Sequence, residues 1–156
     1  MDFFKSFEII DVYKSREVDA EYLNRIKNLK DTPDIKVITG IRRSGKSILM
    51  QEYIQYLKDN FNDINVIFID FMDLSFEHLK EYHALHAYVE KRYVEGKSNY
   101  LFIDEVQMCP NFELAVNSLY SKRKYDIYIT GSNAFLLSAD LATLFTGRYI
   151  EIHVYP

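Results

Sequence analysis

The sequence predicts an α/β doubly wound domain built on a parallel sheet. Short apolar segments rich in β-branched and aromatic residues alternate with longer segments whose apolar residues recur every three or four positions. The short segments are almost continuously apolar, which indicates strands that are covered on both faces. A length of 156 residues suits one compact domain and is too short for two ordinary ones.

Five segments are expected to form the strands of this sheet. Each is short, and each is bounded by turn-forming or polar residues, two of them by a glycine. The five segments are residues 35–39, 65–71, 100–103, 127–130 and 149–154.

Helices are expected between the strands, with one more ahead of the first strand. The evidence is the spacing of apolar and aromatic side chains by three or four residues, which places them on one helix face. These residues are Val18, Tyr22, Ile26 and Leu29; Leu49, Tyr53 and Leu57; Leu79, Tyr82, His86, Val89 and Tyr93; and Phe112, Val116 and Leu119.

Composition excludes several classes of function. A formal net charge of −4 argues against a domain that binds nucleic acid over its whole surface. The short basic run at residues 121–124 leaves a local nucleic-acid contact as an alternative to a solvated helix end. A single cysteine, Cys109, favours a reducing compartment. The sequence shows no secretory signal and no apolar run of roughly 20 residues, so we expect a cytoplasmic protein without a membrane partner.

The strongest motif lies directly after the first expected strand. Residues 40–47 read Gly-Ile-Arg-Arg-Ser-Gly-Lys-Ser and match the phosphate loop G-x-x-x-x-G-K-[ST]. The two glycines let backbone N–H groups curve around phosphate oxygens, and the following helix directs its positive end at the same oxygens. A strand before the motif and a helix after it are the context that a phosphate loop requires.

This loop predicts that the chain binds ATP or ADP together with Mg²⁺. Lys46 supplies an ammonium group to the β- and γ-phosphates, and the hydroxyl of Ser47 is a ligand for the metal ion. Arg42 and Arg43 lie inside the loop and are more simply explained as solvated positions than as phosphate ligands. The expected nucleotide-binding residues are Gly40, Ile41, Arg42, Arg43, Ser44, Gly45, Lys46 and Ser47.

A pair of acidic residues ends the third expected strand. Asp104 is placed to hold the magnesium shell, and Glu105 is placed to act as general base on an attacking water. Asp70 ends the preceding strand in the same way but is followed by Phe71 rather than by a second acid. We therefore expect Asp70 at the edge of the site or in a structural role.

Polar residues also follow the last two expected strands. Asn133 and Ser132, with Thr130 behind them, could orient water near the γ-phosphate, although either of the first two could instead cap a helix. Arg148, just before the last strand, is a candidate arginine finger, with a surface arginine as the alternative.

Taken together, these motifs resemble the AAA+ division of P-loop ATPases. The resemblance is narrower to a bacterial and archaeal group that reads G-x-R-x-x-G-K-[ST], then L-x-x-D-E-x-Q, then T-G-S-[NS], then Gly-Arg. The matching stretches here are residues 40–47, Leu101–Gln107, Thr130–Asn133 and Gly147–Arg148.

The resemblance implies a three-layer P-loop NTPase fold with strand order 5-1-4-3-2, and ATP rather than GTP. It also implies an assembly, either a homo-oligomer or a complex with a partner protein through a C-terminal region, in which Arg148 acts in trans. Asn133 would be the sensor residue. We accordingly divide the single domain 1–156 into an N-terminal helical extension at 1–34 and a nucleotide-binding core at 35–156, and expect a further C-terminal domain that this sequence does not include.

Two functions other than ATP hydrolysis remain open at this point. A small-molecule kinase shares the phosphate loop, but a catalytic glutamate such as Glu105 after the magnesium acid argues against it. A nucleotide-binding module without hydrolysis is the other alternative. A GTPase is disfavoured because the sequence contains no Asn-Lys-x-Asp motif.

Overall fold

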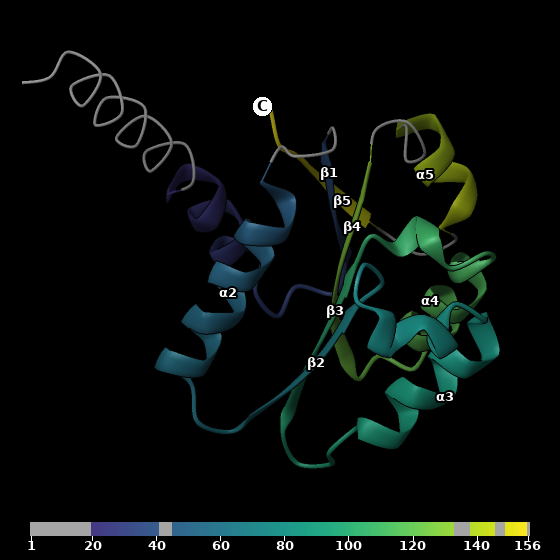
Figure 1. The fold of residues 1–156 in the computed structure, drawn as a ribbon. Helices are drawn as coiled ribbons and strands as arrows, with labels where there is room; N and C mark the ends of the chain where they lie inside the picture. The colour runs from purple at the N-terminus through teal and green to yellow at the C-terminus, as the bar shows by residue number, and fades with distance from the viewer. Residues whose placement is uncertain (1–19, 41–44, 133–137, 146–148, 156) are drawn as a thin grey trace, which may run out of the picture.

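The computed structural model describes residues 20–40, 45–132, 138–145 and 149–155, with the side chains of residues 138–140 left out of the description. A central parallel sheet lies between two layers of helices (Figure 1). This arrangement confirms the predicted α/β class.

Within the described residues the sheet contains five strands, all of them parallel to their neighbours. Their spatial order is β2-β3-β4-β1-β5, which is the expected order 5-1-4-3-2 taken from the opposite edge. The strand that leads into the phosphate loop therefore lies inside the sheet. The strands are β1 (Ile35–Gly40), β2 (Ile64–Asp70), β3 (Ser98–Asp104), β4 (Tyr125–Ser132) and β5 (Tyr149–His153).

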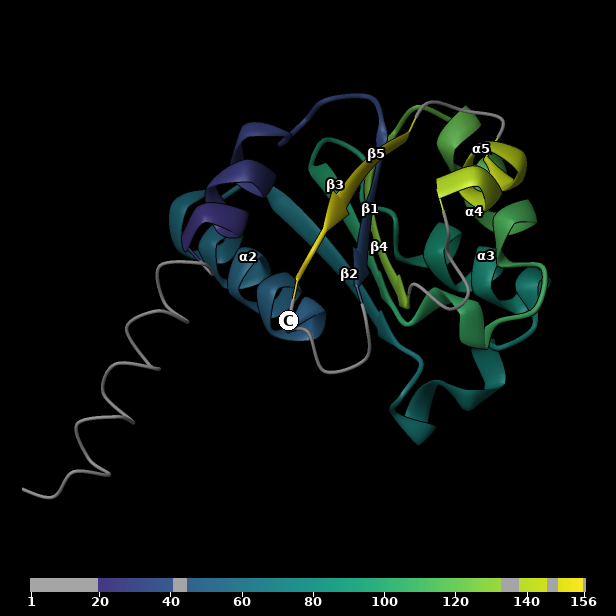
Figure 2. The same cartoon turned by 90° about the horizontal axis from the view of Figure 1, so that it is seen from above.

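Helices cover both faces of the sheet. Figure 2 shows α2 and the helical residues 20–28 on one side, and α3, α4 and α5 on the other. Two short 3₁₀ helices follow β2 and β3. The helical elements are α2 (Lys46–Asn60), η1 (Leu74–Leu79), α3 (Tyr82–Arg92), η2 (Val106–Met108), α4 (Phe112–Ser121) and α5 (Ser138–Leu144).

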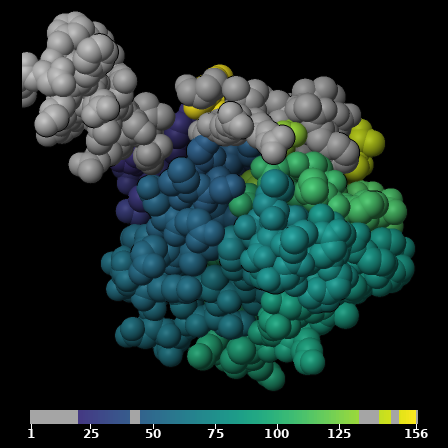
Figure 3. Space-filling model, in the orientation of Figure 1, coloured from purple at the N-terminus to yellow at the C-terminus, as the bar shows by residue number. Residues whose placement is uncertain are grey.

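The hydrophobic core is divided in two by the sheet, because successive side chains of a strand point to opposite faces. In β1, Val37 packs in the cluster that includes α3 and α4, whereas Ile38 packs in the cluster that includes α2. Ile129 and Tyr128 of β4 divide in the same way. Figure 3 shows the surface in the orientation of Figure 1, with the blue residues of α2 on one side and the teal residues of η1 and α3 on the other. Burial on both faces explains why the strands are apolar almost throughout.

The prediction of one continuous helix across residues 79–93 is wrong. The chain forms η1 and then starts again at α3, because the Glu81 carboxylate accepts hydrogen bonds from two amide groups of the first turn of α3. Tyr93 lies beyond the end of α3 in an extended conformation. His86 is only half-buried, and its Nε2 lies 3.0 Å from the hydroxyl of Ser118.

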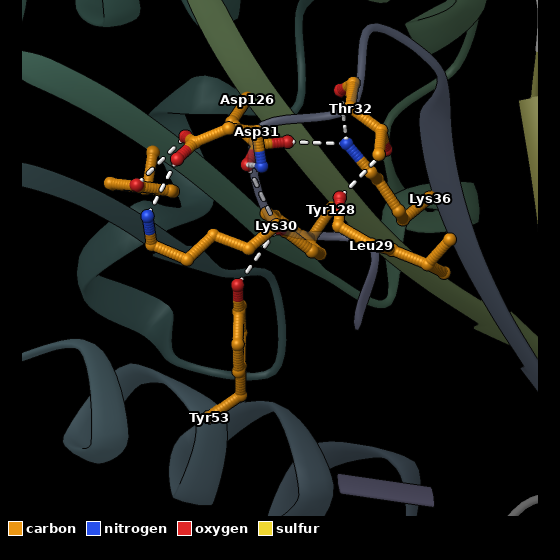
Figure 4. A network of polar contacts seen from close by, with 9 residues as sticks. Leu29, Lys30, Asp31, Thr32, Lys36, Tyr53, Asp126 and Tyr128 are labelled. Carbon is orange, nitrogen blue, oxygen red and sulfur yellow. Dashed lines mark hydrogen bonds and ion pairs between the residues drawn. The ribbon is translucent and has the colours of Figure 1, made fainter. Parts of the chain in front are cut away.

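A buried ion pair joins the neighbouring strands β1 and β4 near their amino ends (Figure 4). Lys36 Nζ lies 2.6 Å from Asp126 Oδ1 and also donates to the carbonyl oxygen of Thr32. The second carboxylate oxygen of Asp126 accepts from the amide of Asp31 and the hydroxyl of Tyr128. Burial raises the pKa of Asp126, and the charge of Lys36 opposes that rise. This network ties the segment that precedes β1 to the sheet.

Candidate functional site

The predicted site residues lie at the carboxyl ends of the parallel strands, which all meet at the same end of the sheet. β1 ends at Gly40, β3 ends at Asp104 and β4 ends at Ser132, which is in register with Gly40. The middle of the phosphate loop, residues 41–44, lies outside the described residues. What the structure shows of the loop is its two ends, on β1 and on α2.

Gly45 is the N-cap of α2 and has a φ of 92°. This left-handed conformation favours glycine, because a side chain there strains the backbone. A Cβ at this position would meet nothing within 4 Å, so the need for glycine is conformational rather than steric. Among the described residues, no side chain caps the first turn of α2 and no acidic residue lies in it. The positive end of the helix dipole is therefore available to an anion.

Lys46 is buried directly after this glycine, with 3% of its surface exposed. Its Nζ donates to the carbonyl oxygen of Gly40 at 3.1 Å and lies 3.9 Å from Glu105 Oε1. A buried ammonium group requires such partners, because leaving water is costly for a charge. The contact with Glu105 joins the phosphate loop to the acid pair. The first acid of the pair, Asp104, lies 58 residues after Lys46 in the sequence.

Asp104 and Glu105 are held together by the hydroxyl of Thr130. This residue is fully buried in β4, next to β3. Its Oγ1 accepts from the amide N–H of Glu105 at 2.8 Å and donates to Asp104 Oδ1. One hydroxyl thus fixes both the backbone of the candidate base and the carboxylate of the candidate magnesium acid.

Glu105 adopts an unusual backbone conformation for a non-glycine residue, with φ 55° and ψ 55°. The left-handed turn takes the chain out of β3 and into η2. The Oε2 of Glu105 accepts a hydrogen bond from Gln107 Nε2 at 2.5 Å. Both carboxylate oxygens therefore have a cationic or amide partner, which holds the side chain at the edge of the sheet near Lys46.

Asp70 lies beside this pair, in register with Asp104 on the neighbouring strand. Its Oδ1 accepts from the amide of Met72. Burial raises the pKa of Asp70, the Met72 amide opposes this rise, and the negative charges of Asp104 and Glu105 add to it. Asp70 thus lies next to the acid pair, and both predicted roles for it, at the edge of the site or structural, stay predictions.

Thr39, immediately before Gly40, anchors the end of β1 to the edge strand. Its buried hydroxyl donates to Glu151 Oε1 at 2.8 Å and lies 3.1 Å from His153 Nδ1. The amide of Val154 donates to the carbonyl oxygen of Thr39. The start of the phosphate loop is therefore held from the β5 side as well as from β4.

The oxygen ligands that could hold a metal ion here are few. Ser47 lies exposed in the first turn of α2, and the Asp104 carboxylate is almost buried. Across the described ranges, no group of three or more His, Cys, Asp or Glu side chains could hold a metal by itself. Mg²⁺ in nucleotide sites uses one or two protein side chains, with phosphates and waters as the other ligands. This set of donors fits that kind of site.

The structure brings together three of the predicted functional side chains, those of Lys46, Asp104 and Glu105. Asn133 and Arg148 lie outside the described residues, so their roles remain predictions. The hydrogen bonds of Thr130 to both acids and of Gln107 to Glu105 were not predicted from the sequence. Two features of the sequence could have indicated these contacts. Thr130 is a polar residue at the end of an apolar strand, and Gln107 carries an amide side chain two residues after the acid pair.

Known proteins similar to this chain share most of its length. A family model described as "AAA domain" matches residues 32–156. An uncharacterized protein of Haemophilus influenzae is 39% identical over 137 residues, which is 86% of this chain and 34% of that protein. An uncharacterized protein of Methanocaldococcus jannaschii is 31% identical over 139 residues, which is 88% of this chain and 30% of that protein. The chain thus spans about a third of the length of these relatives.

Among solved structures, a chain in the structure of Drosophila ORC bound to AT-rich DNA and Cdc6 has a TM-score of 0.63. The match covers 100% of this chain and 63% of that one at 9% sequence identity, so it supports the fold alone. None of the helices in the described part of the chain is both long and apolar enough to span a membrane.

The parallel sheet, its strand order and the phosphate-loop ends agree with the family match over residues 32–156. This chain belongs to the AAA domain family of P-loop ATPase-type domains.

Proposed function

We propose that this domain binds ATP with Mg²⁺ and hydrolyses its terminal phosphoanhydride bond. The observation that carries the proposal is the distance of 3.9 Å between Lys46 Nζ and Glu105 Oε1, where Glu105 directly follows the buried Asp104. A candidate phosphate-binding cation, a candidate base and a candidate metal ligand thus lie together at the carboxyl ends of the strands. Hydrolysis requires all three of these functions.

Lys46 is placed to change partners when a nucleotide binds. Its ammonium group contacts a carbonyl oxygen and a carboxylate, both of which are weaker electrostatic partners than the β- and γ-phosphates of ATP. The amino end of α2 and the left-handed turn at Gly45 would support the same phosphates through backbone N–H groups. These features account for binding of the triphosphate.

Ser47 and Asp104 are the residues that would hold Mg²⁺, which would neutralise charge on the phosphate oxygens. Glu105 would accept a proton from the attacking water. The hydrogen bonds from Gln107 and to Thr130 restrict where Glu105 can lie, which is the positioning that a general base needs. We further propose that Asn133 orients the water and that Arg148 supplies positive charge, in the same chain or from a neighbouring copy.

Steady-state phosphate release with Mg²⁺ and ATP tests the proposal. Glu105→Gln removes the base and should lower the rate by roughly 10²–10⁴-fold. Glu95→Gln is the matched control, because Glu95 is an exposed residue in the turn before β3. If the wild type and both variants release phosphate equally, Glu105 is not the base.

Nucleotide binding is tested separately by thermal denaturation. A nucleotide at a concentration of about 100 times its Kd stabilises the folded state by about 2.7 kcal/mol. That corresponds to a rise in Tm of roughly 5–10 °C for a domain of this size. Lys46→Ala should abolish the rise, whereas Lys58→Ala, on the exposed side of the same helix, should keep it. An unchanged rise in the Lys46 variant would contradict the assignment of the site.

A non-hydrolysing nucleotide-binding module is the second candidate. It is favoured by the engagement of both Glu105 oxygens, one near Lys46 and one with Gln107, because an engaged carboxylate is a poor proton acceptor. The two candidates differ in one measurement: the module would show the Lys46-dependent rise in Tm but no phosphate release that depends on Glu105.

A further inference from the structure

A polar cavity lies at the end of the sheet opposite to the phosphate loop. Its volume is about 320 Å³, and it is lined by residues 31–33, 97–99 and 123–126, together with Tyr120. These segments precede or begin β1, β3 and β4, so the cavity lies at the amino ends of three parallel strands. The candidate ATP site uses the carboxyl ends of the same strands.

The acidic residues of this cavity already have partners. Asp126 accepts from Lys36 with one oxygen and from the Asp31 amide and the Tyr128 hydroxyl with the other (Figure 4). The carboxylate of Asp31 accepts from the Tyr100 hydroxyl and from Lys30. These carboxylates have little capacity left to attract a cation or a hydrogen-bond donor.

Asn99, on the lining at the start of β3, is also fully engaged. Its side-chain amide donates to the carbonyl oxygens of Val94 and Lys97, and its Oδ1 accepts from Val94 N and from Asn65 Nδ2. The neutral lining of this part of the cavity therefore serves as structure and offers little to a ligand.

The basic residues of the lining have fewer partners than the acidic ones. Lys97 and Arg123 are exposed, and within the described part of the chain neither makes an ion pair. Lys124 contacts Glu90 at 3.2 Å, but Lys122 shares that carboxylate. Lys97 and Arg123 thus give the cavity two cationic groups of hydrogen-bond donors that no ion pair of the described residues engages.

Lys97 and Arg123 both lie in or directly after a tight turn of the backbone. Arg123 has a φ of 54° in the turn that ends α4, and its amide donates to the carbonyl oxygen of Tyr120. Lys97 follows Gly96, which has a φ of 85°. A left-handed arginine is uncommon, because its side chain crowds the backbone in that region. Both turns direct the chain into strands that line the cavity.

We infer that this cavity binds a phosphate group carried by a larger molecule, with Lys97 and Arg123 as its main ligands. A lysine and an arginine left without acidic partners suit a compact oxyanion, since guanidinium and ammonium groups form charge-assisted hydrogen bonds with phosphate oxygens. A cavity of 320 Å³ has room for roughly ten water molecules, which is more than a bare phosphate ion needs. The site is separate from the proposed ATP site.

The test uses the Lys46→Ala chain, so that the phosphate loop does not contribute to binding. Calorimetric titration would measure two ligands: ribose 5-phosphate, a free phosphomonoester, and a single-stranded DNA oligonucleotide. The pocket variant adds Lys97→Gln and Arg123→Gln. The control variant adds Lys58→Gln and Lys91→Gln, which remove the same charge from exposed positions outside the cavity.

We expect a ligand that binds to lose roughly tenfold or more in affinity in the pocket variant, and to be little affected in the control variant. If ribose 5-phosphate shows this pattern, the phosphate belongs to a small molecule. If only the oligonucleotide shows it, the phosphate belongs to a nucleic acid strand. The inference is wrong if neither ligand binds at millimolar concentration, or if the pocket and control variants bind alike. Comparison of Tm values between the two variants checks that the pocket variant is folded.

Discussion

Replacement of Thr130 by valine removes one hydroxyl and keeps the shape of the side chain. That hydroxyl accepts from the amide of Glu105 and donates to the carboxylate of Asp104. Thr130 is fully buried and Asp104 is 3% exposed, so water cannot easily replace the lost donor. The variant therefore tests whether the acid pair depends on β4 for its position.

The expected cost follows from the two hydrogen bonds. A buried hydrogen bond to a charged group contributes about 1.5–3 kcal/mol, and one between neutral groups about 0.5–1.5 kcal/mol. Glu105 is partly exposed, so part of the second contribution can be recovered from water. We expect Thr130→Val to lower the free energy of unfolding by about 2–4 kcal/mol.

Urea denaturation of the wild type, Thr130→Val and Thr130→Ser measures this cost. Serine keeps the hydroxyl and loses one buried methyl group, which costs about 1 kcal/mol. Phosphate release should fall in the valine variant more than in the serine variant, because only valine releases the backbone of Glu105. Equal stability of the valine variant and the wild type, or equal losses in the two variants, would refute the reasoning.

Three further predictions concern other parts of the structure. Gly45→Ala should lower the free energy of unfolding by about 1–2 kcal/mol in urea denaturation, because the strain is conformational, and an asparagine there should cost less. Lys36→Met should cost about 3–5 kcal/mol by leaving Asp126 buried without its cation, and the double variant with Asp126→Leu should recover most of that loss. Asp70→Asn should raise Tm at neutral pH, because the folded state raises the pKa of Asp70 and so disfavours its charged form. As the pH falls through that raised pKa, Asp70 becomes protonated and the advantage should disappear; an advantage that grows toward acid pH would contradict this.

Much of the fold could be predicted because strands that are buried on both faces leave a clear apolar pattern. The five strands were identified in this way, and their order followed from the resemblance to AAA+ ATPases. The phosphate loop and the acid pair were predicted from sequence motifs, and their functional roles stay predictions. The break between η1 and α3 was missed because Glu81 caps a helix through its side chain, and the apolar spacing continues past that cap.

The polar contacts could be predicted less well, because they join residues far apart in the sequence. Thr130 lies 26 residues from Asp104, and Lys36 lies 90 residues from Asp126. A lysine within the first strand and an aspartate beside the fourth were visible, but only the register between β1 and β4 shows that they meet. The roles of Asn133 and Arg148 stay predictions.

The position of β1 inside the sheet has a consequence for synthesis of the chain. Of the five strands in the described residues, β1 is made first, yet both of its neighbours, β4 and β5, come from the last third of the sequence. The strand that begins the phosphate loop therefore cannot acquire either partner until most of the domain has been translated. Pairings at such long sequence separation form slowly, and unpaired strand edges are prone to aggregation. We expect the nascent domain to become competent for nucleotide only after β4 leaves the ribosome, and to be most vulnerable to aggregation before then.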